Sequence, residues 1–223
     1  MRFKPLASFV FFLGLIVAPM AQADQQNISA NTEGEPTRIV GFGDSLMAGY
    51  QLPPEDAFPA RLQQALKEKG YDVAIENAGV SGDTTTGGLA RLDWSVPDGT
   101  QIVILELGAN DALRGISPDI TEKNLDAMLT RLEERGITVI LVGMLAPPNM
   151  GNDYGTKFNA IYPRLTKKHG VRLYPFFLDG VAAQKNLLLD DGMHPNPEGV
   201  ARMVEGILPV IERVLQEVRK EGT

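Results

Sequence analysis

Five short apolar runs rich in β-branched residues alternate along the chain with segments of helical periodicity. Strands that alternate with helices are typical of a parallel sheet covered on both faces, with right-handed crossovers. Uninterrupted apolar strands fit burial on both sides of such a sheet. The sequence therefore predicts an α/β fold in the order βαβαβαβαβα. The expected strands span residues 37–42, 73–76, 102–107, 138–143 and 171–174. Helical periodicity locates four of the five helices, over residues 58–69, 121–135, 158–169 and 197–220.

The N-terminus has the features of a secretory signal peptide. Arg2 and Lys4 precede an apolar run over residues 6–17, and a small-x-small pattern ends at Ala23. The run holds about a dozen apolar residues, whereas a bilayer-spanning helix needs roughly 20. We therefore expect residues 1–23 to be removed on export, which leaves a periplasmic or secreted protein with no stable membrane anchor.

The rest of the chain is long enough for one domain but cramped for two. After cleavage 200 residues remain, which suits a domain that buries roughly 70% of its unfolded surface. We expect a flexible polar leader over residues 24–36 and a single domain over residues 37–223. Loss of two basic residues would take the net charge from −7 to −9. Because phosphate neutralisation needs basic residues, this charge excludes nucleic-acid binding.

The scarcity of cysteine and histidine restricts the chemistry further. The chain has no cysteine, so disulfides, thiol nucleophiles and thiolate metal sites are excluded. The two histidines, His169 and His194, stand 25 residues apart in unlike contexts, whereas a catalytic zinc usually needs two or three imidazoles. We expect no metal and no cofactor, and any imidazole chemistry must rest on one histidine.

Polar, glycine-bearing turns follow four of the expected strands. Ligands of parallel α/β sheets bind outside the carboxyl ends of the strands, where these turns would share one edge. They are therefore the first candidates for a functional site. The turns span residues 41–46, 78–84, 108–111 and 190–196.

The first turn contains Gly43-Asp44-Ser45-Leu46. By itself this is also what an ordinary helix N-cap looks like. It is neither a dinucleotide fingerprint, which needs a third glycine where Leu46 stands, nor a phosphate-binding loop. A serine that opens a helix after a strand would be exposed at the sheet edge. Its N–H could hold a developing oxyanion, so the functional interpretation is a nucleophile.

The last turn contains Asp191-x-x-His194. It could simply be a polar loop in which Pro195 and Pro197 shape the entry to the final helix. The functional interpretation is a base that takes the serine proton through one ring nitrogen while a carboxylate holds the other. A spacing of three can bring Asp191 to the ring, and Asp190 is the rival for that role.

The two middle turns contain Gly82 and Asn110. Each has an ordinary structural explanation, since glycine suits a positive-φ turn and asparagine a helix cap or turn. Together they could provide a backbone N–H and a side-chain amide for an oxyanion.

The other polar residues are expected to be structural or supporting. His169 ends an expected helix beside Gly170, where a cation suits the helix dipole. Asp83, Glu106 and Asp111 are candidates for contacts behind the site, with loop capping or a buried polar pair as the default.

In this order, Gly-Asp-Ser-Leu, the glycine of Ser81-Gly82-Asp83, Gly-x-Asn-Asp and Asp-x-x-His-Pro resemble the conserved blocks of the GDSL or SGNH hydrolase family. The resemblance spans nearly all of the expected domain. It implies a three-layer, flavodoxin-like fold with a five-stranded parallel sheet of order 2-1-3-4-5 and helices on both faces. It also implies that Ser45 is the nucleophile, His194 the general base and acid, and Asp191 its orienting carboxylate. The implied oxyanion hole consists of the Ser45 and Gly82 N–H groups and the Asn110 side chain.

The resemblance further implies a mobile substrate loop over residues 112–118. One departure is Ala109, where relatives often have glycine, and its methyl group could alter how the backbone presents Asn110. Substrate contacts are implied at Asp44, Leu46, Ala112, Leu113 and Pro147.

The expected function is hydrolysis of small-molecule acyl esters and thioesters, of the arylesterase, lysophospholipase and acyl-CoA thioesterase type. We expect the protein to act as a monomer. A negative protein without a basic cluster suits the phosphates of coenzyme A poorly, so carboxyl esters are favoured. A carbohydrate O-acetyl esterase is an alternative, although Trp94 is the only tryptophan for sugar stacking. A non-catalytic periplasmic lipid or glycan binder is another, but it would predict loss of Ser45 or His194.

Overall fold

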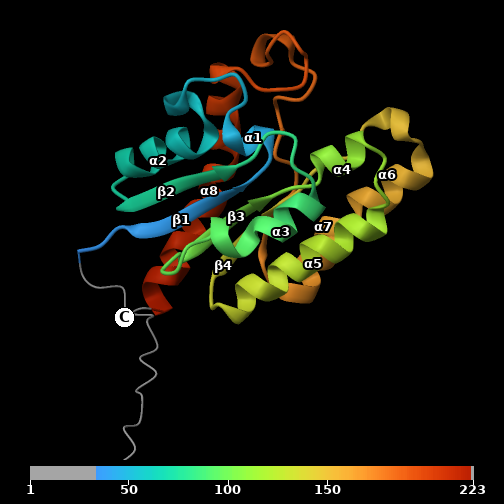
Figure 1. Ribbon diagram of the computed structural model, residues 1–223. Coiled ribbons are helices and arrows are strands. Elements are labelled where there is room, and N and C mark those ends of the chain that lie inside the picture. The colour runs from blue at the N-terminus through green and yellow to red at the C-terminus, as the bar shows by residue number, and fades with distance from the viewer. Residues whose placement is uncertain (1–33, 222–223) are drawn as a thin grey trace, which may run out of the picture.

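The computed structural model describes residues 34–221, in which five strands form one parallel sheet (Figure 1). The predicted parallel sheet and its order, β2-β1-β3-β4-β5, are confirmed. The expected signal peptide and most of the expected leader lie outside the described residues. The strands are β1 (Thr37–Gly43), β2 (Val73–Gly79), β3 (Ile102–Glu106), β4 (Thr138–Val142) and β5 (Arg172–Tyr174).

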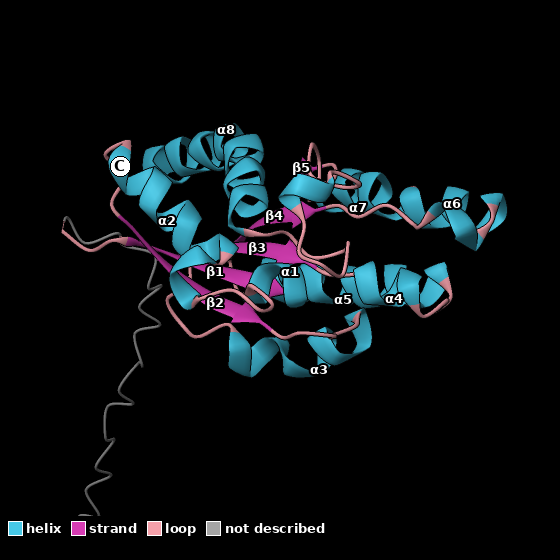
Figure 2. Ribbon diagram, turned by 90° about the horizontal axis from the view of Figure 1, so that it is seen from above, coloured by secondary structure: helices cyan, strands magenta, loops and turns pink. Residues whose placement is uncertain are grey.

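Helices cover both faces of the sheet, as predicted. On one face α2 packs against α8, and on the other α5 packs against α3 and α7. Figure 2 shows α2 and α8 on one side of the strands and α5 and α7 on the other. The helices are α1 (Ser45–Ala48), α2 (Phe58–Glu68), α3 (Thr85–Ser95), α4 (Ala109–Leu113), α5 (Pro118–Glu134), α6 (Asn152–Asn159), α7 (Ile161–His169) and α8 (Pro197–Glu221).

The strand order opens a crevice next to the central strands. The chain runs from β1 to β2 on one side and then crosses to β3 on the other side of β1. The intervening helices α2 and α3 therefore lie on opposite faces, which leaves the carboxyl ends of β1 and β3 uncovered. All five residues of β3 are buried, as are Leu62 and Leu66 of α2 and Leu125 and Met128 of α5. This core fixes the ends of β1 and β3 beside each other.

Two differences from the expected helices have a physical reason in the sequence. The alternation required a helix between the second and third strands but did not locate it, and the structure places α3 there. Gly87 and Gly88 weaken the helical pattern of this segment. Gly88 is nevertheless required, because a Cβ there would clash with Leu107 Cδ1. The helix expected over residues 158–169 is divided into α6 and α7. Pro163 has no N–H to continue the hydrogen bonds of a longer helix, and it fits in the first turn of a new one, which begins at Ile161.

Within residues 34–221, every helix is too short or too polar to span a bilayer.

Candidate active site

Ser45 stands at the junction between β1 and α1. Asp44 caps α1, and its Oδ1 accepts the Leu46 N–H at 3.0 Å. Gly43 must be glycine because a Cβ there would clash with the Glu106 side chain and backbone. The strand can therefore turn sharply into the helix, which leaves Ser45 half-buried at the sheet edge. Its backbone N–H belongs to the first helical turn, whose amides have no partner within the helix.

A continuous hydrogen-bonded relay joins Ser45 to the last turn. His194 Nε2 lies 2.9 Å from Ser45 Oγ, and His194 Nδ1 lies 2.7 Å from Asp191 Oδ2. Asp191, rather than its neighbour Asp190, is the carboxylate that contacts the ring. With a proton on Nδ1, the Nε2 lone pair faces the serine hydroxyl.

The same carboxylate also shapes its own turn. Asp191 Oδ1 accepts the N–H groups of Met193 at 2.9 Å and His194 at 3.0 Å. These bonds, led by the one from the His194 backbone, lower the pKa of Asp191 to about 2. Gly192 adopts a positive φ of 69°, and the Leu189 N–H donates to the His194 carbonyl at 2.7 Å. The turn thus presents a charged carboxylate and the ring in fixed relation.

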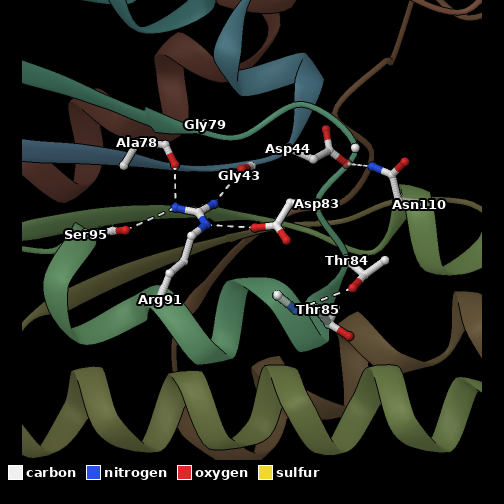
Figure 3. Close-up of polar contacts among 12 residues, drawn as sticks. Gly43, Asp44, Ala78, Gly79, Asp83, Thr84, Thr85, Arg91, Ser95 and Asn110 are labelled. Atoms are coloured by element: carbon white, nitrogen blue, oxygen red, sulfur yellow. Dashed lines mark hydrogen bonds and ion pairs between the residues drawn. The ribbon is translucent and has the colours of Figure 1, made fainter.

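Asn110 is held by the buried Asp44 carboxylate. It lies in the first turn of α4, after the cap residue Gly108, and its Nδ2 donates to Asp44 Oδ2 at 3.0 Å (Figure 3). The amide has a second N–H, and Asn110 lines the same cavity as Ser45. Ala109 is the first residue of α4, and its methyl group does not prevent the contact between Asn110 and Asp44.

Glu106 and Asp44 form a buried acidic pair behind the serine. Glu106 is fully buried at the end of β3, and its Oε2 accepts the Asp44 N–H at 3.2 Å. Burial raises the pKa of Asp44 to about 6. Burial and the nearby Asp44 carboxylate raise the pKa of Glu106 well above its ordinary value. Ionisation of Asp44 is therefore costly, and Glu106 retains its proton more readily than an exposed glutamate.

Gly82 lies in the adjacent turn rather than on the cavity wall. Its φ of +81° confirms the expected positive-φ turn, which the Asp83 N–H closes by donating to the Val80 carbonyl at 3.0 Å. The Val80 N–H donates to the Gly43 carbonyl at 3.0 Å, which places this turn beside the end of β1. Arg114 Nη2 donates to the Gly82 carbonyl at 2.7 Å and joins the turn to the expected substrate loop.

A cavity of about 460 Å³ opens next to Ser45 and His194. Three of the five expected substrate contacts line it, but Asp44 and Ala112 do not. Asp44 and Ala112 are buried behind the cavity wall, with exposed fractions of 0% and 1%. The structure therefore does not support the substrate contacts expected at these two residues. The residues that line the cavity are mainly apolar, and these include Leu46, Leu113, Met144, Leu145, Pro147, Pro148, Phe176, Leu178, Ala182, Ala183, Leu188 and Met193.

Sequence reasoning missed part of this lining and one ring contact. Met144 and Leu145 follow β4, and Phe176 and Leu178 follow β5, so the rule that ligands gather at strand ends could have found them. Tyr50, five residues after Ser45, packs on His194 with 4.4 Å between ring centroids. No pattern in the sequence pairs those two rings.

The remaining candidates have structural partners. His169 ends α7 beside Gly170, as expected, and its ring contacts Asp126 and Glu133. Asp83 pairs with a buried arginine, and Asp111 accepts hydrogen bonds from Thr85 and Thr121. Within the described range, no three histidine or acidic side chains gather in a way suited to a metal ion.

Comparisons with known proteins agree with this geometry. The model of the GDSL-like Lipase/Acylhydrolase family matches residues 42–202. An arylesterase of Vibrio mimicus is 44% identical over 165 residues, which cover 72% of this chain and 81% of that protein. The Thioesterase 1/protease 1/lysophospholipase L1 of Escherichia coli K12 is 39% identical over 156 residues, or 70% and 74% of the two chains.

A solved structure agrees as well. The crystal structure of AlinE4, an SGNH-hydrolase family esterase, is 43% identical and has a TM-score of 0.69, covering 82% of this chain and 99% of that one. The sequence match and the shared fold lead to one assignment. The chain belongs to the GDSL-like lipase/acylhydrolase family of SGNH esterases.

Proposed function

We propose that the chain hydrolyses esters and thioesters of acyl chains through an acyl-enzyme on Ser45. The observation that carries this proposal is the relay from Ser45 Oγ to His194 Nε2, at 2.9 Å, and from His194 Nδ1 to Asp191 Oδ2, at 2.7 Å. A hydroxyl, an imidazole and a carboxylate in this sequence of contacts are what a serine nucleophile needs.

In the first step Ser45 Oγ attacks the substrate carbonyl carbon while its proton passes to His194 Nε2. The carbonyl π electrons move to oxygen and form a tetrahedral oxyanion. When this intermediate collapses, His194 gives the proton to the leaving alcohol or thiol, and the acyl group stays on Ser45. Asp191 stabilises the imidazolium and remains a carboxylate, in keeping with its lowered pKa.

In the second step water replaces the leaving group. His194 takes a proton from the water as its oxygen attacks the acyl carbon, and a second oxyanion forms. Its collapse breaks the bond to Ser45 Oγ, which recovers a proton from His194, and the carboxylic acid leaves. Both oxyanions would be held by the N–H groups of Ser45 and Gly82 and by the Asn110 amide.

The cavity supports an acyl substrate. Its mainly apolar lining and its volume of about 460 Å³ suit a hydrocarbon chain beside the nucleophile. A coenzyme A thioester carries several phosphates, which a protein of net charge −7, or −9 after loss of Arg2 and Lys4, would repel. We therefore favour carboxyl esters as the main substrates, with thioester cleavage as a lesser activity. Trp94 is exposed on α3 and does not line the cavity, which disfavours carbohydrate O-acetyl esters.

The sequence supports a place of action outside the cytoplasm. The basic start, the short apolar run and the small-x-small pattern ending at Ala23 support export with cleavage there. The mature protein would be a periplasmic or secreted monomer with one domain over residues 37–223.

Steady-state kinetics on wild type and Ser45→Ala test the proposal. We expect kcat/KM on p-nitrophenyl esters to rise from acetyl to medium-chain acyl groups, and Ser45→Ala to lower it about 10⁴-fold or more. Palmitoyl-CoA should be a poorer substrate than lysophosphatidylcholine. Unchanged activity in Ser45→Ala would overturn the nucleophile. A preference for acetyl esters would contradict the acyl cavity, and a large advantage for palmitoyl-CoA would contradict the ester preference.

A further inference from the structure

Arg91 is a nearly buried cation below the sheet edge that carries the active site. It comes from the middle of α3 and is 7% exposed. Figure 3 shows its guanidinium pointing at the ends of β1 and β2. Nη2 donates to the Gly43 carbonyl and Nη1 to the Ala78 carbonyl, both at 2.8 Å. One side chain therefore holds the ends of two neighbouring strands.

The same guanidinium also holds the turn that contains Gly82. Its Nε donates to Asp83 Oδ2 at 2.7 Å, and the two side chains are only 8% and 10% exposed. A buried charge needs such a partner, because an unpaired one is costly. Asp83 directly follows Gly82, and its N–H closes the turn on Val80. The ion pair thus fixes the turn from its C-terminal side.

These contacts bracket the two backbone donors of the proposed oxyanion hole. Gly43 lies two residues before Ser45, and Asp83 lies one residue after Gly82. The guanidinium also stacks on the Phe42 ring, 4.0 Å from its centroid, which fixes its own plane. Besides Ser95 Oγ of its own helix, at 3.3 Å, this planar fork reaches three acceptors on two other segments and sets the distance between those segments.

We propose that Arg91 is a positioning residue that sets the spacing between the Ser45 and Gly82 N–H groups. It touches no substrate and acts through Gly43 and Asp83. This inference rests on the proposed acyl transfer, because only an oxyanion needs those two donors at a defined separation. Lysine keeps the charge but offers donors from a single point, so it cannot reproduce the three-way contact.

Arg135 provides a matched control for the loss of a supporting arginine. Arg135 follows α5, and its Nη2 donates to the Val96 carbonyl at 2.7 Å. Val96 lies in the segment that joins α3 to β3. That contact lies at the amino-terminal edge of the sheet, away from Ser45. Arg135→Met should therefore lower the melting temperature without changing catalysis.

The experiment measures kcat, KM and melting temperature for wild type, Arg91→Lys, Arg91→Ala, Arg135→Met and Ser45→Ala with one p-nitrophenyl ester. Misplaced donors reduce the stabilisation of the transition state more than they reduce substrate binding. Arg91→Lys should therefore lower kcat about 10- to 100-fold with KM nearly unchanged. Added guanidinium at millimolar concentration should restore part of the kcat of Arg91→Ala. The Arg135→Met enzyme should keep the wild-type kcat.

A folded Arg91→Lys enzyme with the wild-type kcat would overturn the inference. So would an equal loss of kcat in Arg135→Met at the same loss of melting temperature. If the Arg91 variants do not fold, Asp83→Asn keeps the side-chain shape and removes the charge. It should lower kcat at constant KM, and an unchanged kcat would again overturn the inference. Retained activity in Ser45→Ala would instead be a failure of the proposed acyl transfer.

Discussion

The two histidines of this chain meet similar carboxylates but different groups on their other ring nitrogen. His194 contacts Asp191 through Nδ1 at 2.7 Å and the Ser45 hydroxyl through Nε2 at 2.9 Å. His169 contacts Asp126 through Nε2 at 2.7 Å and Glu133 through Nδ1 at 3.1 Å. A carboxylate beside an imidazole is therefore common to both regions and does not by itself make a catalytic site.

The second nitrogen decides what each ring can do. Both nitrogens of His169 face acceptor oxygens, so the ring ties the end of α7 to α5 and has no hydroxyl to deprotonate. In His194 one nitrogen contacts an acid and the other faces a hydroxyl, so a proton can pass between the ring and that hydroxyl. His194 also lines the cavity, whereas the His169 side chain is 5% exposed between two helices.

The largest expected difference is between the two histidine variants. His194→Gln removes the proposed base and should lower kcat/KM about 10⁴-fold or more. His169→Gln loses contacts with partly exposed acids, so it should lower the free energy of unfolding by about 1 kcal/mol and leave kcat/KM within about twofold. Ester hydrolysis and urea unfolding of both variants check this. Comparable losses of activity would break the distinction.

The carboxylates extend the comparison. Asp191→Asn removes the acceptor that orients the ring and should lower kcat about 10³- to 10⁴-fold. Asp126 has its pKa lowered mainly by Lys168, and Asp126→Asn should cost less than about 1 kcal/mol of stability with no loss of kcat. Initial rates at saturating ester measure kcat for the two variants, and urea unfolding measures their stability. A larger loss of kcat in Asp126→Asn than in Asp191→Asn would contradict the different roles given to the two carboxylates.

Two asparagines form a third pair. Asn110→Ala removes one proposed oxyanion donor and should lower kcat about 10²- to 10³-fold. Asn124 donates to Thr85 and Thr86 hydroxyls on α3 instead, so Asn124→Ala should lower the melting temperature and leave kcat unchanged. Stopped-flow acylation rates separate the two effects. Equal acylation rates in Asn110→Ala and wild type would remove Asn110 from the oxyanion hole.

The smallest expected effect concerns two aspartates whose pKa values shift in opposite directions. Asp191 has a lowered pKa, so its contribution to stability is present above the ordinary pKa and is lost as pH falls toward 2. Asp44 has its pKa raised to about 6, so the folded state holds this proton more tightly than the unfolded state. Asp44 therefore lowers the free energy of unfolding as pH rises from about 4 to about 7.

Asp44→Asn removes this titration. Compared with wild type, the variant should gain up to about 3 kcal/mol of stability between about pH 4 and pH 7, at about 1.4 kcal/mol per pKa unit. Urea unfolding at both pH values measures the change. A difference between variant and wild type that stays constant with pH would contradict the buried, pKa-raised state of Asp44.

The sheet was predictable because its signals are local and repeated. Five apolar runs separated by helical segments predicted a parallel sheet, and the strand-end rule directed attention to the turns that hold Ser45, Asn110 and His194. The helix α3 was not located because Gly87 and Gly88 obscure its pattern. The division between α6 and α7 depends on Pro163, whose missing N–H leaves the apolar spacing of the segment unchanged.

The site was predictable in its residue types but not in all its contacts. The resemblance to a family named Ser45, Asp191 and His194, and the structure places them within hydrogen-bonding distance. It also implied substrate contacts at Asp44 and Ala112, which the structure buries behind the cavity wall. The packing of Tyr50 on His194 and the reach of Arg91 to two strand ends depend on tertiary contacts, for which sequence spacing has no signal.

Labelling with a fluorophosphonate, followed by mass spectrometry of the peptides, tests the assignment of the nucleophile most directly. We expect a single adduct on the peptide that contains Ser45, retained in His169→Gln and lost in His194→Gln. An adduct on another residue, or equal labelling of the two histidine variants, would contradict the account.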